Sequence, residues 1–420
     1  MHKQRVLANG GLPEAHWGAS QQAVVDFMFA AKADFEVANH LGNIGQDADS
    51  SQCLIGNPVG GEEVRTSGMK IQMTKRLVWI LRLIVAVVAI ACSAVFVPWD
   101  AACVYFAPLP DTVQEQADAV MRHGMDGIIV YVDQAGKKPA FYAAGWKDRQ
   151  TKVAADPQAL FKIGSISKLY IAVSAAKLVS AKRLSLDDTL AQYLPELVGR
   201  IENADKITLA MMLRHRSGIA NFTENSRFRW DKAVSVTEVL NLVLDKPAEF
   251  EPDGRYSYSN TNYLLVGKIL DKTLGYRHQD YIKAEILAPL SLNHTYSLFS
   301  EVDAADVVSG YVVGYDGDMK PLDYVIPGGS MVATAQDVGI FLRALNDGAL
   351  LKDEERAIYA SIYVYDHTGL VPGYQSIARY QKEIDTVVVQ FTNTSGRYSW
   401  MTSEANFSRI FRILRRQDMH

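Results

Sequence analysis

The sequence predicts an α+β fold, in which one sheet is completed by both ends of a domain and packed by helices, preceded by one transmembrane or signal helix. Strand-like stretches begin at residue 127 and return between residues 374 and 392. Helical patterns dominate the part between them. A charge-free apolar run, from Leu83 to Trp99, precedes the domain. The 420 residues, 48% hydrophobic and 21% charged, have an ordinary globular composition.

The chain divides into three parts. Residues 1–72 have no sustained helical or strand period and are rich in turn-forming residues, which predicts a disordered extension. Residues 73–99 carry Lys75 and Arg76 ahead of an apolar run that only Arg82 interrupts. That run can cross a bilayer if Arg82 reaches the headgroups, and its basic flank predicts a cytoplasmic start. Residues 105–420 then form the folded domain.

Alternative interpretations of the apolar part stay open. Residues 77–99 act as a membrane anchor, or as a cleaved signal if translation begins at Met69 or Met73. A buried core helix is the remaining structural alternative. As anchor or signal, the segment places the domain on the outer side of the cell membrane, periplasmic or extracellular, or leads to its secretion.

Charge and residue content exclude several classes of protein. The net charge of -4 lacks the basic excess that nucleic acid binding requires. No cysteine follows Cys103, which excludes a disulfide framework or a cysteine nucleophile in the domain. The histidines lack paired metal-ligand spacing and no Gly-rich phosphate loop occurs. We therefore expect no metal, no cofactor and no nucleic acid partner.

Local patterns predict each element of the domain in order. A helix is expected at residues 111–124, followed by two strands around the turn Gln134-Ala135-Gly136. The later elements are helices at 165–181, 235–244, 261–274 and 335–346, strands at 374–380 and 385–392 around the turn EID, and a closing amphipathic helix at 402–415.

The stretch FKIGSISKLYIAVSAAKLV pairs a nucleophile with a base. Ser165 and Lys168 lie at i and i+3 of the predicted helix, so the amine can reach the hydroxyl. A lysine accepts the serine proton once desolvation lowers its pKa, and this apolar stretch supplies the desolvation. Gly164 marks the helix start, where free backbone N–H groups can bind an oxyanion.

A second S-x-x-K copy, Ser174 and Lys177, lies in the same helix. At about 100° per residue, Ser174 is on the opposite face from Ser165, so at most one pair can face a given pocket. We interpret Ser174 as a serine on the back of the helix and Lys177 as a lysine that extends to solvent.

Two further motifs follow in order. Tyr258-Ser259-Asn260 lies between a Pro/Gly turn and the predicted helix 261–274, where side chains can point into a cleft. His367-Thr368-Gly369 comes just before the closing strands. Either motif alone is common, but the ordered set of three is improbable by chance.

This set resembles the penicillin-recognising serine hydrolases: class C beta-lactamases, D-Ala-D-Ala carboxypeptidases, D-aminopeptidases and related esterases. The resemblance covers about residues 111–415, and in that family the boxes S-x-x-K, Y-x-N and K/H-T-G occur in the same order. Further similar stretches are LFKIGSISK, KRLSLDDTLAQYLPEL, LRHRSGI, YSNTNYLLVGKIL, PGGSMVATAQDVGIFLRAL and VPGYQS.

The resemblance implies a beta-lactamase/transpeptidase-like fold, an antiparallel sheet flanked by helices plus an all-helical region, with the catalytic cleft between them. It makes Ser165 the acylated nucleophile and Lys168 its base. It makes Tyr258 a phenol that relays a proton to the leaving group.

The resemblance also implies substrate-binding roles. Asn260 would hold the acyl-side amide, and His367, followed by Thr368 and Gly369, would replace the cationic lysine of other members. The backbone N–H groups of Ser165 and Leu370 would form the oxyanion hole.

Three features qualify the substrate and activity. Leu370 stands where related carboxypeptidases carry a hydroxyl that grips a terminal carboxylate, which favours ester, amide or amino-terminal D-residue substrates. Residues 351–366 make a shorter connection than is usual in the family, so the rim of the cleft is expected to be more open, or the enzyme damaged. An imidazole at His367, with an ordinary pKa near 6.5, predicts activity that changes between about pH 5.5 and 7.5.

These observations predict a serine hydrolase that works through an acyl-enzyme on Ser165. The expected substrates are peptidoglycan-related D-amino acid peptides, beta-lactams or small esters. The alternative is a catalytically weak penicillin-binding sensor or scaffold of the same fold. The serine and lysine pair favours the enzyme, because a binding module needs no nucleophile and base.

Overall fold

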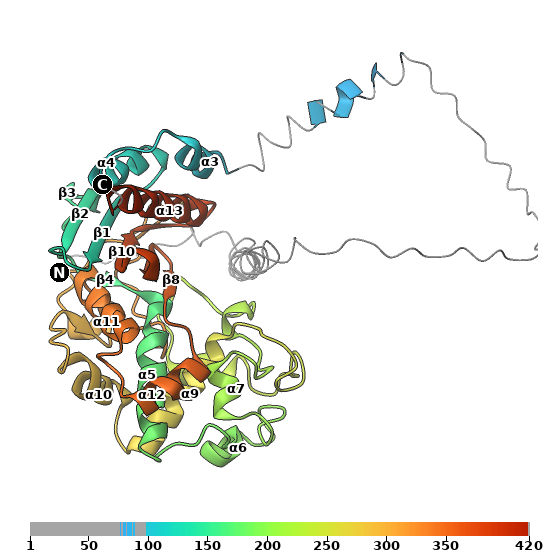
Figure 1. Ribbon diagram of the computed structural model, residues 1–420. Coiled ribbons are helices and arrows are strands. Elements are labelled where there is room, and N and C mark those ends of the chain that lie inside the picture. Colours follow the sequence, from blue (N-terminus) through green and yellow to red (C-terminus); the bar gives the residue numbers. More distant parts are fainter. Residues whose placement is uncertain (1–75, 77–78, 81, 86, 89–97, 419–420) are drawn as a thin grey trace, which may run out of the picture. The chain divides into compact units, whose positions relative to one another are not determined.

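A six-stranded antiparallel sheet organises the chain from Pro98 onward. The computed structural model describes residues 76, 79–80, 82–85, 87–88 and 98–418 (Figure 1). The strand order is β3-β2-β1-β10-β9-β8. The bounds are β1 Gly127–Gln134, β2 Ala140–Asp148, β3 Val153–Ala154, β8 His367–Val371, β9 Tyr374–Gln381 and β10 Thr386–Thr392.

The two ends of the domain meet at the middle of this sheet. β1 pairs with β10 in an antiparallel register that sets Ile128 opposite Thr392. Both strands are almost entirely buried, because helices cover both faces of the sheet. The expectation of one sheet completed by both ends is confirmed.

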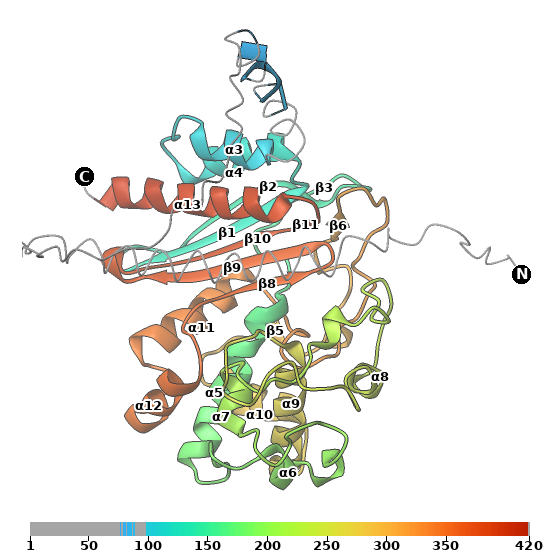
Figure 2. The same ribbon diagram turned by 90° about the vertical axis from the view of Figure 1, so that its right-hand side faces the viewer.

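Helices cover the two faces differently (Figure 2). One face carries α3 (Trp99–Phe106), α4 (Val113–Val120) and α13 (Ser399–Asp418), and the other carries α11 (Ala335–Asp347). α4 begins at Thr112, whose hydroxyl accepts the N–H of Glu115 while the Glu115 carboxylate accepts the N–H of Thr112.

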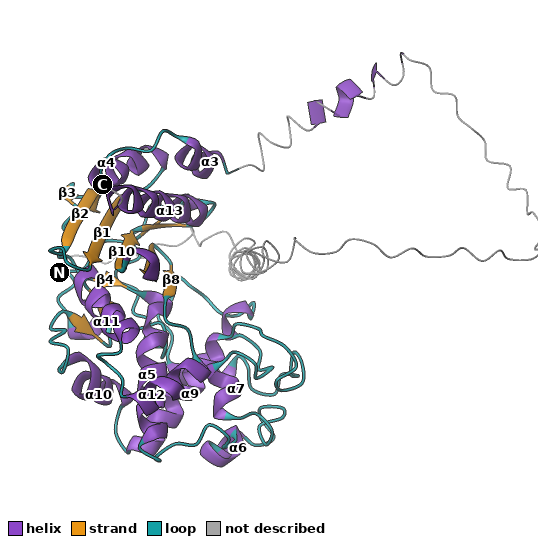
Figure 3. Ribbon diagram, in the orientation of Figure 1, coloured by secondary structure: helices purple, strands orange, loops and turns teal. Residues whose placement is uncertain are grey.

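The remaining helices form a second region below the sheet (Figure 3). Its centre is α5 (Ser167–Ser180), which is buried nearly all round because other helices surround it. The other helices are α6 Leu190–Tyr193, α7 Leu209–Leu213, α8 Val236–Asn241, α9 Asn260–Leu274, α10 His278–Ile282 and α12 Asp353–Ile362.

Short elements complete the domain. Small sheets pair β4 (Phe161–Lys162) and β5 (Thr295–Tyr296) with β7 (Val332–Ala333), and β6 (Tyr311–Val312) with β11 (Thr394–Ser395). The 3-10 turns are η1 Met121–His123, η2 Gly164–Ile166, η3 Pro195–Leu197, η4 Phe222–Glu224, η6 Phe299–Glu301 and η7 Lys382–Ile384, and η5 Lys283–Leu287 is a π-helical turn.

Several sequence expectations can be compared with these bounds. The predicted helix 165–181 begins as the 3-10 turn η2 before α5, and the predicted helix 235–244 is shorter, Val236–Asn241. Residues 351–366, for which the sequence analysis predicted no helix, contain α12. α12 packs against α5, so a helix fills part of this short connection.

The N-terminal expectations remain predictions. The extension 1–72 lies outside the described residues, and the transmembrane or signal segment 73–99 lies largely outside them. Within the described part of the chain, no helix combines the length and the apolar character that a membrane span requires.

Candidate active site

The start of α5 is pressed against strand β8. Gly164 has φ +54°, and a Cβ there would lie 3.0 Å from the backbone nitrogen of Leu370. A Cβ on Gly369 would lie 2.0 Å from the carbonyl oxygen of Ile163. The Ser376 hydroxyl donates to that same carbonyl at 2.9 Å. Glycine at both positions therefore lets the turn carrying Ser165 approach the amide of Leu370.

Two side chains contact the Ser165 hydroxyl oxygen, and a third contacts the first of these two. Lys168 Nζ lies 3.0 Å from Ser165 Oγ, and the Tyr258 hydroxyl donates to Ser165 Oγ at 2.8 Å. Lys168 Nζ also lies 2.9 Å from Asn260 Oδ1 and 2.9 Å from the carbonyl oxygen of Gly328. The structure thus brings together four of the residues that the sequence singled out.

The hydrogen bonds of Lys168 define its protonation chemistry. A neutral amine has two N–H donors and one lone pair. Because the carbonyl of Gly328 and Oδ1 of Asn260 are acceptors, they take both donors and leave the lone pair for the Ser165 hydroxyl. In this state Ser165 donates its proton toward Lys168, which is the arrangement that general base catalysis requires.

Burial favours the neutral form of Lys168. Its side chain is 1% exposed, and this burial lowers the pKa of the amine from 10.5 to about 7. None of the three hydrogen-bond partners of the amine is a carboxylate. The desolvation expected from the apolar stretch is therefore present in the fold.

Tyr258 contributes a neutral phenol. The residue is 8% exposed, and burial raises the pKa of its hydroxyl above 10, so the group keeps its proton at neutral pH. The ammonium position of Lys168 lies 5.0 Å from the centre of the Tyr258 ring. Tyr258 can therefore donate a proton beside Ser165, where a leaving group would depart.

Asn260 opens α9 and is held by polar neighbours. Its backbone N–H donates to Asn221 Oδ1 at 3.1 Å, and its side-chain nitrogen lies 3.5 Å from Asn221 Oδ1 and 3.5 Å from Thr223 Oγ1. Its oxygen holds Lys168. Besides the substrate contact that the resemblance implies, Asn260 thus orients the Lys168 amine.

The His367 ring is engaged at both nitrogens. Nδ1 contacts the carbonyl oxygen of Thr368, which can only accept, so Nδ1 carries a proton. Nε2 lies 2.7 Å from the hydroxyl of Tyr363, which donates to it when the ring is neutral. Tyr363 follows the last residue of α12, and no motif in residues 351–366 indicated it.

The second S-x-x-K copy lies away from this group. The Ser174 hydroxyl is buried and donates to the carbonyl of Tyr170 at 2.9 Å. Lys177 Nζ is 3.7 Å from Glu355 Oε2 on α12, and its side chain is 14% exposed. The interpretation of Ser174 as a back-face serine is confirmed, but the extension of Lys177 to solvent is wrong, because α12 covers that side of the helix.

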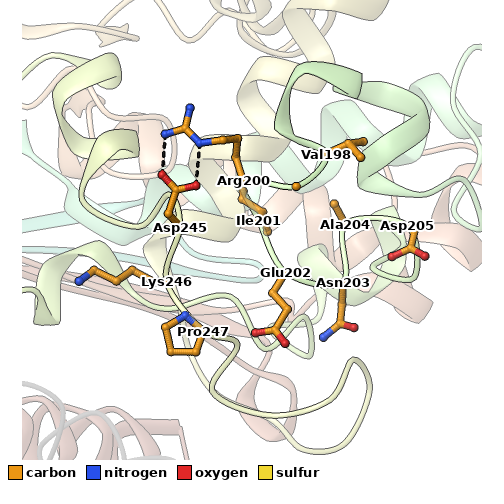
Figure 4. Close-up of a pocket in the computed structure, with 11 residues that line it drawn as sticks. Val198, Arg200, Ile201, Glu202, Asn203, Ala204, Asp205, Asp245, Lys246 and Pro247 are labelled. Carbon is orange, nitrogen blue, oxygen red and sulfur yellow. Dashed lines mark hydrogen bonds and ion pairs between the residues drawn. The ribbon is translucent and has the colours of Figure 1, made fainter.

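A hollow and the search for metal ligands complete the description of candidate sites in the described residues. A hollow of about 660 Å³ lies among residues 198–205 and 245–247, where Arg200 and Asp245 form a two-bonded ion pair (Figure 4). None of the residues around Ser165 lines it. Within the described residues, no cluster of three His, Cys, Asp or Glu side chains could hold a metal ion.

The family profile for beta-lactamase matches residues 111–361. Penicillin-binding protein 4 of Amycolatopsis lactamdurans is 28% identical over 257 residues, which cover 59% of this chain and 67% of the relative. Protein flp of Staphylococcus aureus strain MW2 is 25% identical over 193 residues, 44% of this chain and 39% of the relative. The matched part of the chain thus covers between about two fifths and two thirds of the length of these relatives.

Solved structures share the fold. D-amino acid amidase from Ochrobactrum anthropi SV3, complexed with D-phenylalanine, superposes with a TM-score of 0.64 at 22% identity, covering 73% of this chain and 98% of the amidase. EstCE1, a hydrolase with promiscuous acyltransferase activity, superposes with a TM-score of 0.56 at 19% identity, covering 74% of this chain and 99% of that protein. At these identities the likeness concerns the fold alone.

Proposed function

The chain belongs to the beta-lactamase family, and from this premise we propose that it is a serine hydrolase with Ser165 as nucleophile. One observation carries the proposal. The amine of the buried Lys168, whose pKa burial lowers to about 7, lies 3.0 Å from the Ser165 hydroxyl oxygen, and the Tyr258 hydroxyl donates to the same oxygen. A nucleophile, a base and an acid at one point are the parts that acyl transfer requires.

The proposed reaction proceeds in two stages. The Ser165 proton passes to Lys168 Nζ as Oγ bonds to the substrate carbonyl carbon, and the N–H groups of Ser165 and Leu370 stabilise the oxyanion. Tyr258 gives a proton to the departing nitrogen or oxygen, which leaves an acyl ester on Ser165. Lys168 then returns its proton to Tyr258, which leaves the amine neutral again. Water attacks the ester and gives a proton to Lys168, and that proton passes to Ser165 Oγ as the acid is released.

The proposed substrates are small amides or esters, including those of D-residues and beta-lactams. Leu370 is apolar and offers a terminal carboxylate no hydrogen bond from its side chain. This favours substrates without a free carboxyl end. The D-amino acid amidase with the same fold, complexed with D-phenylalanine, makes amides of D-amino acids the first substrates to test.

The proposed location is outside the cytoplasm. The basic flank at Lys75 and Arg76, followed by the apolar residues 77–99, supports a membrane anchor or a cleaved signal. A fusion of residues 69–105 to alkaline phosphatase would test this, since that reporter is active only after export. An inactive fusion would contradict the proposal.

Intact-mass measurement tests the function. We expect a fluorophosphonate to add one adduct to the wild type and to Ser174→Ala, and none to Ser165→Ala. An adduct of equal yield on Ser165→Ala would contradict the proposal. Ser174→Ala is the matched control, because it removes the serine of the second S-x-x-K copy.

Penicillin separates the enzyme from a sensor of the same fold. A penicillin adduct that disappears within minutes and regenerates free protein indicates hydrolysis. An adduct that persists for hours, together with no turnover of amides or esters, indicates the sensor or scaffold.

A further inference from the structure

We propose that His215 is a positioning residue that holds the Tyr258 phenol against Ser165; this inference rests on the proposed function of that site. His215 lies two residues after α7, is 2% exposed, and does not hydrogen-bond to Ser165. It contacts the segment around Tyr258 in three independent ways.

The first two contacts hold the backbone on both sides of Tyr258. The N–H of Ser257 donates to the carbonyl of His215 at 2.9 Å. The N–H of Ser259 donates to Nδ1 of the His215 ring at 3.2 Å. The residues before and after Tyr258 are therefore both tied to His215, so Tyr258 cannot shift along its strand-like segment without breaking one of them.

The third contact is with the phenol ring itself. The His215 and Tyr258 ring centres are 4.5 Å apart with planes 33° apart, and the Tyr263 ring centre lies 5.2 Å from His215. A ring packed against one face of the phenol blocks its swing about χ1 toward that side and favours a single orientation; χ1, unlike χ2, moves the hydroxyl oxygen. That orientation is the one in which the Tyr258 hydroxyl reaches Ser165.

The protonation and tautomer of the His215 ring follow from its contacts and its burial. Since Nδ1 accepts a backbone N–H, the proton of the neutral ring resides on Nε2. Burial, together with Lys168 and His367, lowers the pKa of His215 well below 6.5, so the ring is neutral in the working range. A neutral ring adds no positive charge beside Lys168.

Stability alone does not account for this residue. Nε2 is buried and has no hydrogen-bond partner within the described part of the chain, and an unmet buried donor costs free energy. His215 also has φ +55°, a conformation that few residues other than glycine adopt. A position with two unfavourable features is better explained by what it does for Tyr258.

The inference has a chemical signature. Proton delivery by Tyr258 matters most when the leaving group is a poor one, such as an amine, and least when it is an activated phenolate. Loss of His215 should therefore slow amide hydrolysis strongly and activated ester hydrolysis weakly. A general loss of folded protein would slow both equally.

The experiment compares His215→Ala and His215→Asn with the wild type in the full chain. The substrates are D-phenylalanine amide and 4-nitrophenyl acetate. We expect kcat for the amide to fall by about 10- to 100-fold in His215→Ala, and the ester rate to fall by less than about 3-fold. His215→Asn should lose less of its amide hydrolysis than His215→Ala, because the asparagine Oδ1 can accept the Ser259 N–H and asparagine tolerates a positive φ.

A second comparison removes Tyr258 first. In a Tyr258→Phe background, His215→Ala should cause almost no further loss of amide hydrolysis, because the group it positions is absent. Equal losses on both substrates, or losses that multiply in the Tyr258→Phe background, would overturn the inference. If His215→Ala does not fold, His215→Asn undergoes the same two comparisons.

His278→Asn is the matched control. His278 is 3% exposed, its Nδ1 lies 2.8 Å from Asp271 Oδ1, and it contacts neither Tyr258 nor its neighbours. It should lose stability without a preference between the two substrates. An amide-selective loss in His278→Asn as large as in His215→Ala would overturn the inference.

A crystal structure of His215→Ala gives a readout that does not depend on activity. We expect the Tyr258 hydroxyl to move from 2.8 Å to beyond hydrogen-bond reach of Ser165 Oγ in part or all of the molecules. An unmoved phenol would overturn the positioning role. A wild type whose Ser165 no fluorophosphonate phosphonylates would instead overturn the proposed function.

Discussion

Lys168 Nζ lies 3.0 Å from Ser165 Oγ at the start of α5, and Lys168 is only 1% exposed. The carbonyl of Gly328 and Oδ1 of Asn260 take the other hydrogen-bonding positions of the amine. The protonation state of this one nitrogen therefore controls whether Ser165 can act as a nucleophile, and several measurable consequences follow from it and from its surroundings.

The rate at which Ser165 reacts with a fluorophosphonate should rise with pH and level off above about pH 7. Below the lowered pKa of Lys168, about 7, the amine is protonated and cannot accept the serine proton, so the rate should fall about tenfold per pH unit. Fluorophosphonate inactivation measured from pH 5 to 9 gives the profile. A rate that is flat or falls over this range would contradict Lys168 as the base.

The pH dependence of stability should differ between the wild type and Lys168→Met. The folded pKa of about 7 lies below the unfolded value near 10.4, so between these pH values the unfolded chain holds more protons. The free energy of unfolding should therefore rise with pH in this window, relative to Lys168→Met, by up to about 1.4 kcal/mol per unit. Urea denaturation at pH 7, 8 and 9 measures the slope; parallel curves for both proteins would rule out a depressed pKa.

Gly164→Ala should reduce both stability and activity. The new Cβ would meet the Leu370 nitrogen at 3.0 Å in a residue with φ +54°, so strain of about 1 to 3 kcal/mol is expected. The separation of the two oxyanion donors should also change. Gly124→Ala is the control, because Gly124 has φ +77° but no atom within 4 Å of an added Cβ. It should lose stability and keep the rate at which Ser165 reacts with a fluorophosphonate, as measured by denaturation and by fluorophosphonate inactivation.

Tyr363→Phe should weaken catalysis by altering His367. The change removes the hydroxyl that lies 2.7 Å from Nε2, and the loss of one such hydrogen bond corresponds to a fall in kcat/KM of about 2- to 10-fold. Nitrogen-15 NMR of the imidazole should show an altered Nε2 signal. Tyr359→Phe is the control, since its hydroxyl donates to the Val364 carbonyl and not to His367; an equal change in both variants would argue against a specific role.

The sequence predicted the parts of the site that depend on local geometry. The pairing of Ser165 with Lys168 follows from i, i+3 spacing on one helix, and the apolar flanks predicted the burial that lowers the pKa. Alternation and apolar runs also predicted β9 and β10. These features needed only neighbouring residues.

Other parts depend on contacts between distant segments and leave no local signal. The Gly328 contact with Lys168 is made by a carbonyl, which every residue possesses, so residue type does not reveal it. His215 meets Tyr258 only after folding, and its positive φ has no pattern in the sequence. Lys177 was expected to reach solvent because the position of α12 over it could not be foreseen.

The sheet that closes the domain sets when during synthesis the site around Ser165 can form. Ile128 pairs with Thr392, and the amide of Leu370 lies beside the turn of Ser165, so neither arrangement exists until the ribosome has released nearly the whole chain. A nascent chain that already contains Ser165 still lacks the backbone N–H of Leu370, which is one of the two proposed oxyanion donors. Chains that stop before Leu370 should therefore contain Ser165 and lack one donor of the proposed oxyanion hole.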